Sequence, residues 1–345
     1  MKKKIENFKN QLEQLQKKYK IAGLSLIILH DNKILHTEGL GYADIEDKIE
    51  AKSNTQYRIA SLTKPISAAI ILKLVELGQL NLDDPIYDLY PEYKKKFQEY
   101  KNRFEEKNLT EILENYNFER EDITIRHHLT HTSKGTPPGD NYSYSGFLFG
   151  ELTKVVNNVS KEGFESLMKH EIINKLKMDS TITCKENEEY EKEPDRLAVP
   201  YCTDEKGKVK RSKYPLFDLN TAAGIISTVE DLAKFDIALN KNQIISEKSK
   251  ELAFTPMISN SGKTLPYGLG WFIQNPTNPN QKILWHYGFG PSISSLYIKI
   301  PSSKLTLIIL ANTDGLCNFP GLADDEDVSR TPFAKIFVDI FKKEE

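Results

Sequence analysis

Apolar segments bounded by turn residues, which are typical of β-strands, lie near both ends of the chain, and one of them, 293–300, shows the strand period of two. Residues 21–30 form an apolar run, Asp31 and Asn32 supply a turn, and residues 33–40 return, so this segment predicts a β-hairpin. Further strands are predicted at 268–274, 282–287, 293–300 and 304–311. A Pro-Ser-Ser turn separates the last two of these strands.

Elsewhere the apolar spacing is three and four, which predicts helices with an apolar face. One such stripe lies near the N-terminus, one lies over residues 62–77, which Gly78 follows as a natural stop, and one lies over the last element, 333–341. Their members are Ile5, Phe8, Leu12 and Leu15; Ile66, Ile70, Leu74 and Leu77; and Phe333, Ile336, Phe337, Ile340 and Phe341.

The N-terminus begins with Met1 and three lysines, but the apolar stretch of a secretion signal does not follow them. We expect the first helix to dock on the body of the protein. A lysine-rich helix lying on anionic lipid is the alternative. As given, the chain is expected to be cytoplasmic, and a leader removed beforehand would instead make it an exported protein.

Residues 93–262 are predicted to be mainly helical, and they begin with mixed charges that are typical of a solvated helix face. The whole pattern predicts an α/β fold of the α+β type. An antiparallel sheet, flanked by helices, is built from both chain ends, and a mainly helical domain is inserted into it. The sheet domain comprises residues 1–92 and 263–345, with the active site expected in the cleft between the two domains.

Charge and composition restrict the class of partner. The 345 residues contain 47 Lys and Arg against 49 Asp and Glu, a formal net charge of −2, so the basic excess of a nucleic-acid-binding protein is missing. No window approaches the ~20 apolar residues of a membrane span. The cysteines, Cys184, Cys202 and Cys317, have neither the number nor the spacing of a disulfide framework or a zinc site. We expect a small-molecule or short-peptide substrate, no nucleic acid and no stable membrane insertion, and leave the oligomeric state open, with a monomer allowed.

One short catalytic pattern remains once the common signatures are excluded. The chain has no Gly-x-Ser-x-Gly, Gly-x-x-x-x-Gly-Lys, His-Glu-x-x-His or Gly-x-Gly-x-x-Gly, which disfavours α/β-hydrolases, nucleotide enzymes, zincins and Rossmann dehydrogenases. Ser-x-x-Lys occurs twice, at Ser61 to Lys64 and at Ser166 to Lys169. The first copy opens the long apolar helix, whereas the second lies within an ordinary amphipathic helix.

The start of a helix is a favourable place for a nucleophile. Unpaired N–H groups and the positive end of the helix dipole surround Ser61, and a spacing of three places Lys64 on the same face. If burial lowers the pKa of Lys64, its amine can activate the serine. Judged from these residues alone, a helix cap with an exposed lysine is an equally good interpretation.

Two later segments decide between these interpretations. Tyr144-Ser145-Gly146 introduces another helical run, and His286-Tyr287-Gly288 ends a strand. With Ser-x-x-Lys they have the order and approximate spacing of the three motifs of serine penicillin-recognising enzymes. The sequence resembles the class C β-lactamase and D,D-peptidase-like serine hydrolases, which include carboxylesterases and D-aminopeptidases. The resemblance extends to residues 21–23, 39–44, 57–60, 74–85, 123–133 and 223–235.

The resemblance implies a β-lactamase/transpeptidase-like fold and a catalytic group of three side chains. Ser61 would be the nucleophile, Lys64 its partner, and Tyr144 a second base that moves a proton between the serine and the leaving group. Lys64 and Tyr144 would titrate as a coupled unit. The resemblance implies no metal and no organic cofactor.

The resemblance also implies the residues that bind substrate. His286 would orient substrate and lend positive potential, and Gly288 would let the strand approach the substrate closely. Backbone N–H groups of Ser61 and Phe289 would form the oxyanion hole.

Two departures from the family's motifs bear on the substrate. Gly146 stands where β-lactamases have an asparagine that holds the acyl side chain. His286 replaces the lysine of Lys-Thr-Gly, and a histidine of ordinary pKa is mostly uncharged at neutral pH. Both favour a small ester or amide without an obligatory carboxylate, with esterase-like activity first and D-amino-acid peptidase or amidase activity next. β-Lactamase or D,D-carboxypeptidase activity is an alternative, and a catalytically inactive relative that binds peptide or cell-wall fragments is another.

The remaining candidates have weaker chemistry. His127, His128 and His131 lack the companion carboxylate or cysteine spacing of a metal site. Trp271 and Trp285 are expected to pack in the core. Residues 217–220 are a candidate border of the cleft, and residues 93–122 are predicted to add a helical flap.

Overall fold

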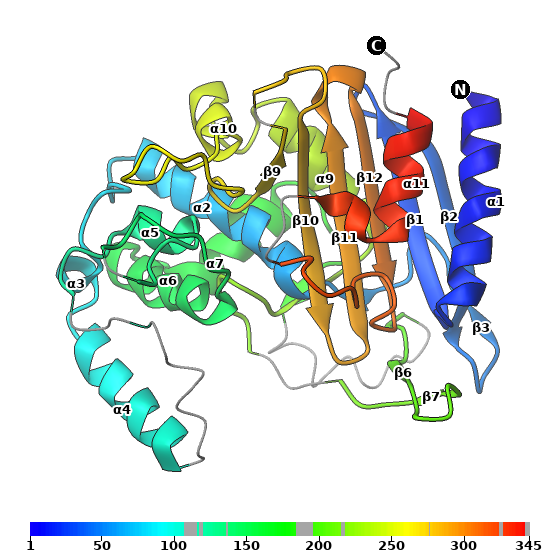
Figure 1. The fold of residues 1–345 in the computed structure, drawn as a ribbon, viewed down its shortest axis with the longest axis horizontal. Coiled ribbons are helices and arrows are strands. Elements are labelled where there is room, and N and C mark those ends of the chain that lie inside the picture. The colour runs from blue at the N-terminus through cyan, green and yellow to red at the C-terminus, as the bar shows by residue number, and fades with distance from the viewer. Residues whose placement is uncertain are drawn as a thin grey trace.

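A seven-stranded antiparallel sheet forms the centre of the protein. The computed structural model describes residues 1–106, 116, 120–135, 137–183, 196–214, 218–275, 277–323 and 327–341. The strands of this sheet are β1 Gly23–His30, β2 Lys33–Asp44, β3 Ile49–Glu50, β9 Phe272–Gln274, β10 Ile283–Gly290, β11 Ile293–Ile300 and β12 Leu305–Ala311. Their order is β3-β2-β1-β12-β11-β10-β9. β1 pairs with β12, with Leu24 opposite Ala311, which confirms a sheet built from both chain ends (Figure 1).

Helices cover both faces of the sheet, because its strands are apolar on both sides. Along β1, Leu24, Leu26 and Ile28 belong to the apolar cluster under one helical layer, whereas Ile27 and Leu29 belong to the cluster on the other face. The first layer contains α1 Lys2–Lys18 and α11 Pro332–Phe341; the second contains α2 Thr63–Glu76 and α9 Val229–Asn240. Figure 1 shows α1 and α11 side by side, away from α2.

The N-terminal helix docks on the body of the protein, as expected. Phe8 and Leu12 are fully buried, and the ring of Phe8 packs edge-on against Phe337 and Phe341 of α11 at centroid distances of 5.9 and 6.0 Å. The apolar stripe of α1 is therefore occupied by the protein itself.

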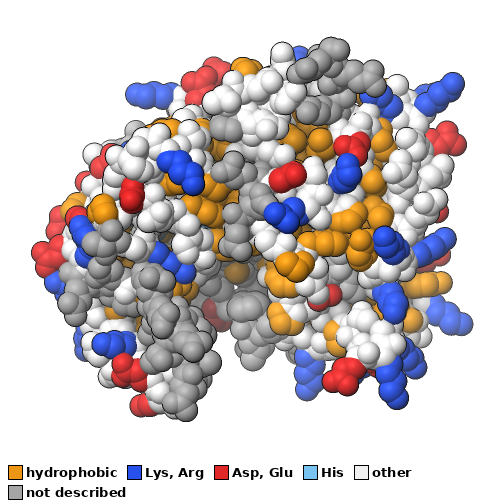
Figure 2. Space-filling model, viewed as in Figure 1, with side chains coloured by type: hydrophobic (Ala, Val, Ile, Leu, Met, Phe, Trp, Pro, Cys, Tyr) orange, Lys and Arg blue, Asp and Glu red, His pale blue; other side chains and the backbone are white. Residues whose placement is uncertain are grey.

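Among the described helices, none is long and apolar enough to cross a membrane. On the face drawn in Figure 2, acidic and basic side chains are interspersed, in keeping with the small net charge.

The middle of the chain is mainly helical, with short strands among the helices. The further helical segments are α3 Ile86–Leu89, α4 Tyr93–Glu106, α5 Ile125–Leu129, α6 Gly146–Val159, α7 Gly163–Leu167, η3 Met168–Asn174 and α10 Glu247–Ala253, with one-turn segments η5 Pro301–Ser303 and η6 Val328–Arg330. Two small sheets join β4 Tyr57–Arg58, β8 Ile225–Ser227 and β5 Ile182–Thr183, and β6 Tyr201–Thr203 with β7 Val209–Arg211. One apolar core joins side chains of these helices to one face of the large sheet. The division into two domains remains a prediction.

Several predicted elements differ in their bounds. The strands expected at 33–40 and 282–287 continue to Asp44 in β2 and to Gly290 in β10. The strand expected at 268–274 is shortened to β9, because Gly270 adopts a φ of +81° that an extended strand does not allow. Trp271 therefore lies just before the strand, yet it is buried as expected, like Trp285. The helix expected from residue 62 begins instead with a 3₁₀ turn, η1 Ala60–Leu62, that leads into α2. Of the other predictions, Cys184, Phe217 and most of the segment 107–119 lie outside the described residues.

Candidate active site

The turn that contains Ser61 is held in an unusual backbone conformation. Ala60 has a φ of +46°, which is costly for a residue with a Cβ atom. The Ser295 hydroxyl donates to the Ile59 carbonyl at 2.9 Å and so ties the turn to β11. On the neighbouring strand, a Cβ atom at Gly288 would lie 2.2 Å from the Ile59 carbonyl oxygen. Glycine is therefore required at 288 for β10 to approach the turn this closely.

Lys64 lies in the first turn of α2, and its side chain returns to Ser61. Its Nζ donates to the Ser61 hydroxyl at 2.9 Å and to the carbonyl of Ala222 at 3.2 Å. The side chain is 0% exposed, and burial lowers the pKa of the amine from 10.5 to about 7. The structure brings Ser61 and Lys64 together and makes the lysine a base of suitable strength at neutral pH.

Tyr144 immediately precedes the residue that caps α6, and its ring completes the group. The Lys64 Nζ lies 5.0 Å from the centre of this ring, and the ring stacks on Phe272 and Tyr287, each at 6.0 Å. Burial raises the pKa of the phenol, and the neighbouring Ser61 hydroxyl opposes this rise without forming an aligned hydrogen bond. Ser61, Lys64 and Tyr144 thus meet at one place, although 80 residues separate Lys64 from Tyr144.

The rate of a reaction that needs neutral Lys64 should rise with pH. With a pKa of about 7, about a tenth of the amine is neutral at pH 6 and about nine tenths at pH 8. We expect kcat/KM for a neutral ester to increase over this range with a midpoint near pH 7, measured by initial rates corrected for spontaneous hydrolysis. Tryptophan fluorescence at each pH checks that the protein stays folded. A constant kcat/KM from pH 5.5 to 8.5 would contradict the assignment of Lys64.

Beside the turn, the edge of β10 has no strand partner among the described residues. β9 pairs with β10 only over residues 283–285, so no described strand covers the edge from His286 to Gly290. Gly290 and Ile293 close the turn to β11, and the alternation of an antiparallel ladder then directs the N–H of Phe289 away from β11, toward the open edge. The N–H of Ser61 lies in the first turn of a helix, where such groups have no helical partner. Their arrangement suits the predicted oxyanion hole, and the exposed Phe289 side chain (46%) adds an apolar surface there.

His286 differs from the role that the resemblance implied. Its ring is 0% exposed, Nδ1 donates to the Tyr287 carbonyl at 2.7 Å, and Nε2 accepts from the Tyr267 hydroxyl at 2.7 Å. Burial and the nearby Lys64 hold the pKa of this histidine well below its usual range. A neutral ring with both nitrogens engaged supplies no positive potential to a substrate. In this geometry His286 instead holds Tyr267, which the sequence did not indicate.

Gly146 leaves space next to the lysine. A Cβ atom at this position would lie 3.7 Å from the Lys64 Nζ, at ordinary contact distance. A side chain here, such as the asparagine of β-lactamases, would therefore meet the amine directly. Its absence removes one polar group from the wall of the site.

The three neighbouring histidines each have a structural partner. His127 Nδ1 accepts from the Thr124 N–H at 3.1 Å and caps α5. His128 contacts the hydroxyls of Tyr93 and Ser133, and His131 accepts from a backbone N–H near Tyr144. Among the described residues, no group of three metal-ligating side chains comes together.

Two further contributors to the site were not assigned a role from the sequence. The Ala222 carbonyl that binds Lys64 is a backbone group, and it lies just before the 223–235 stretch, which showed only family resemblance. Asn220, within the predicted border 217–220, holds this loop by accepting from the Ala222 N–H at 2.8 Å. From the predicted flap, the Tyr116 hydroxyl lies 2.9 Å from the Ser145 hydroxyl, so this segment reaches the residue after Tyr144.

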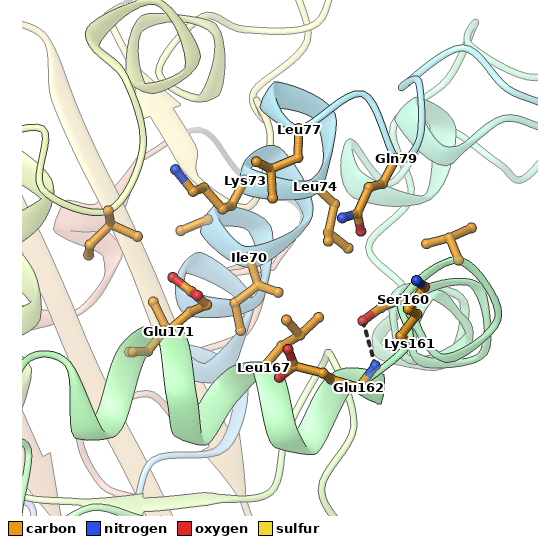
Figure 3. A pocket seen from close by; sticks show the side chains of 14 residues that line it. Ile70, Lys73, Leu74, Leu77, Gln79, Ser160, Lys161, Glu162, Leu167 and Glu171 are labelled. Atoms are coloured by element: carbon orange, nitrogen blue, oxygen red, sulfur yellow. Dashed lines mark hydrogen bonds between the residues drawn. The ribbon is translucent and has the colours of Figure 1, made fainter.

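A separate cavity lies on the far side of α2 from Ser61, Lys64 and Tyr144. It has a volume of about 430 Å³, and neither Ser61, Lys64 nor Tyr144 lines it. Its walls come from α2, the end of α6 and the α7–η3 segment, and charged side chains of both signs surround it (Figure 3): Lys73, Lys161, Glu162 and Glu171. Because the charges are balanced, the lining favours no single class of ligand.

The chain was compared with known protein families. A family model described as Beta-lactamase matches residues 8–326, nearly the whole chain. The chain belongs to the Beta-lactamase family. Proteins of this family are generally serine hydrolases of the β-lactamase and penicillin-binding-protein type, which agrees with the meeting of Ser61, Lys64 and Tyr144.

The curated relatives of this member of the Beta-lactamase family share only about a quarter of their aligned residues with it. Protein flp of Staphylococcus aureus (strain MW2) is 26% identical over 328 residues, covering 85% of this chain and 60% of flp. Penicillin-binding protein 4* of Bacillus subtilis (strain 168) is 25% identical over 355 residues, covering 90% of this chain and 72% of that protein. The chain thus spans about 60% of the length of flp.

Solved structures confirm the fold. The octameric penicillin-binding protein homologue from Pyrococcus abyssi has a TM-score of 0.75 at 23% identity, with 90% of this chain and 74% of that chain covered. EstCE1, described as a hydrolase with promiscuous acyltransferase activity, has a TM-score of 0.72 at 15% identity, with 99% of both chains covered. The predicted β-lactamase/transpeptidase-like architecture is therefore confirmed.

Proposed function

We propose that this chain hydrolyses a small ester or amide through an acyl-enzyme formed on Ser61. The observation that supports it most directly is the 2.9 Å contact between the Ser61 hydroxyl and a fully buried lysine whose pKa is about 7. A catalytically inactive binding protein has no need of a desolvated amine at this place, since burial of an amine costs stability.

The proposed reaction has two halves. The Ser61 oxygen attacks the substrate carbonyl carbon, and its proton passes to the coupled Lys64–Tyr144 pair. The negative oxygen of the tetrahedral intermediate accepts from the N–H groups of Ser61 and Phe289. The bond to the leaving alcohol or amine breaks as that group takes the proton, which leaves the acyl-enzyme. Water then attacks the acyl-enzyme ester and gives up a proton to the same pair. The pair returns this proton to the Ser61 oxygen as the bond to the acyl group breaks, which releases the carboxylic acid.

Three features support a substrate without an obligatory carboxylate. His286 is neutral and buried, so it offers no charge to a substrate carboxylate. Gly146 offers no amide side chain to an acyl group. Phe289 exposes an apolar ring beside the proposed oxyanion hole. We therefore propose esterase-like activity ahead of D-amino-acid peptidase or amidase activity, with β-lactam or D,D-carboxypeptidase substrates behind both.

The test of the proposal is covalent labelling. The full chain is exposed to a fluorophosphonate, its intact mass is measured, and the adduct is located by peptide mapping. We expect one adduct, on Ser61. Folded protein without an adduct would overturn the mechanism and favour a binding protein, and an adduct on Ser166 would mean that the other Ser-x-x-Lys is active.

The preference among substrates needs a second assay. Initial rates are compared for a p-nitrophenyl ester, a D-alanine p-nitroanilide and a chromogenic cephalosporin. We expect kcat/KM to decrease in that order. Faster hydrolysis of the cephalosporin than of the ester would overturn the proposed substrate class while leaving the acyl-enzyme mechanism intact.

A further inference from the structure

His131 holds the backbone on both sides of Tyr144. The N–H of Ser143 donates to the His131 carbonyl at 2.9 Å, and the N–H of Ser145 donates to its Nδ1 at 3.2 Å. The ring of His131 also packs on the ring of Tyr144, with 4.3 Å between centroids and 40° between planes. A single residue therefore contacts Tyr144 and both of its chain neighbours.

The protonation state of His131 follows from these contacts. A nitrogen that accepts from an N–H must have a free lone pair, so Nδ1 is unprotonated and the ring is neutral, with its proton on Nε2. Burial and the nearby Lys64 hold the pKa of this histidine well below its usual range, which agrees with the neutral form. A protonated ring would direct an N–H at the Ser145 N–H and break the contact.

The position of His131 is itself fixed by the segment that precedes it. His131 follows α5 and has a φ of +56°, in the left-handed region. The N–H of Thr132 donates to the His127 carbonyl at 2.8 Å, and the Thr130 hydroxyl donates to the Arg126 carbonyl at 2.8 Å. Tyr144 is thus attached to a short hydrogen-bonded segment rather than to a free loop.

The hydroxyl of Tyr144 is not oriented by a hydrogen bond of its own. It is buried and forms no aligned hydrogen bond with a described residue, although the Ser61 hydroxyl lies nearby. The position of the phenol oxygen relative to Ser61 and Lys64 must therefore come from the ring contacts and from the backbone of residues 143–145.

We propose that His131 is a positioning residue that holds Tyr144 at the distance proton transfer requires, chiefly through the acceptor at its Nδ1. The proposal rests on the proposed function, because a place for Tyr144 matters only if Tyr144 transfers a proton. Displacement of a catalytic group by about 1 Å costs on the order of 10²-fold in rate, so loss of this acceptor should be visible in catalysis.

Two variants of His131 and one matched control test this inference. His131→Ala removes the acceptor, whereas His131→Asn keeps an acceptor near the Nδ1 position and tolerates a positive φ. The control is His128→Ala, three residues earlier, which is equally buried and hydrogen-bonded, to Tyr93 and Ser133, but not to Tyr144. The readouts are the rate constant for fluorophosphonate labelling of Ser61, kcat and KM for an ester, and the thermal midpoint.

The expected pattern separates positioning from stability. His131→Ala should lower kcat and the labelling rate by about 10- to 100-fold with KM within about threefold of wild type. His131→Asn should recover most of this loss, and His128→Ala should lower the thermal midpoint while folded protein keeps nearly wild-type kcat. If His131→Ala does not fold, His131→Asn alone provides the test. A loss of more than tenfold in kcat in folded His131→Asn would overturn the role of the acceptor.

Other outcomes overturn the inference in distinguishable ways. A wild-type labelling rate in folded His131→Ala, or an equal loss in His128→Ala, would show that the segment acts only through stability while leaving Ser61 as nucleophile. Absence of labelling in the wild type would overturn the proposed function and this inference with it.

Discussion

Replacement of Ser61 by alanine should lower ester hydrolysis by at least about 10⁴-fold, because no acyl-enzyme can form without the nucleophilic oxygen. The change is small in structural terms. The Ser61 hydroxyl contacts the Lys64 amine, and the 3₁₀ turn itself is fixed by other groups, including the Ser295 hydroxyl. The variant should therefore stay folded, and the measurement is kcat/KM for a p-nitrophenyl ester with the thermal midpoint determined in parallel.

The matched control is Ser166→Ala, in the other Ser-x-x-Lys. Ser166 is exposed on α7, and its Lys169 pairs with Glu165 at 3.5 Å rather than with a serine. We expect wild-type activity in this variant. Activity retained in Ser61→Ala and lost in Ser166→Ala would reverse the assignment of the nucleophile.

Replacement of Lys64 by methionine should have the second largest effect, a loss of about 10³-fold in kcat/KM. Methionine fills a similar volume without a charge, so the buried site keeps its packing. What is lost is the amine that takes the Ser61 proton. Fluorophosphonate labelling of this variant should slow by a similar factor, which checks that acylation is the affected step.

The same substitution should stabilise the protein at low pH. The pKa of Lys64 is about 7 in the folded chain against an ordinary 10.5, so the folded state binds fewer protons than the unfolded state between these values. The resulting cost to stability is complete below about pH 7 and decreases as the pH rises toward 10.5, and its size is on the order of a few kcal/mol. Lys64→Met should therefore raise the thermal midpoint at pH 6 more than at pH 9. A midpoint that falls at pH 6 would contradict the burial of a costly amine.

Local patterns in the sequence were sufficient to predict most of the fold. An apolar run predicted β1 and alternation predicted β11, because both patterns are typical of strands that pack against other elements of the fold. The bounds of a strand were not predictable where a single backbone angle determines its start. The positive φ of Gly270, for example, prevents β9 from beginning before Phe272. The 3₁₀ turn at Ala60 was likewise not visible, because its conformation is imposed by β10 and β11 rather than by its own residues.

The site was predictable where it is local and where it resembles a known motif. Ser61 and Lys64 lie three residues apart on one helical turn, so their meeting follows from helix geometry. Tyr144 required the family resemblance. The burial of His286 and its hydrogen bond with Tyr267 could not be foreseen, because only tertiary packing brings these two residues together. The Ala222 carbonyl had no signal at all, since every residue has one.

The pairing of β1 with β12 also affects how the protein is made. Leu24 and Ala311 are about 290 residues apart, so the central pair of strands cannot form until the chain through Ala311 has left the ribosome. Contacts of such long sequence separation are associated with slow folding, because their loop must be closed before they contribute stability. The turn around Ser61 depends on Ser295 and Gly288 of the late strands. Ser61 is therefore translated well before the strands β10 and β11 that shape its turn, so we expect a nascent chain, or one truncated before β10, to be inert toward esters.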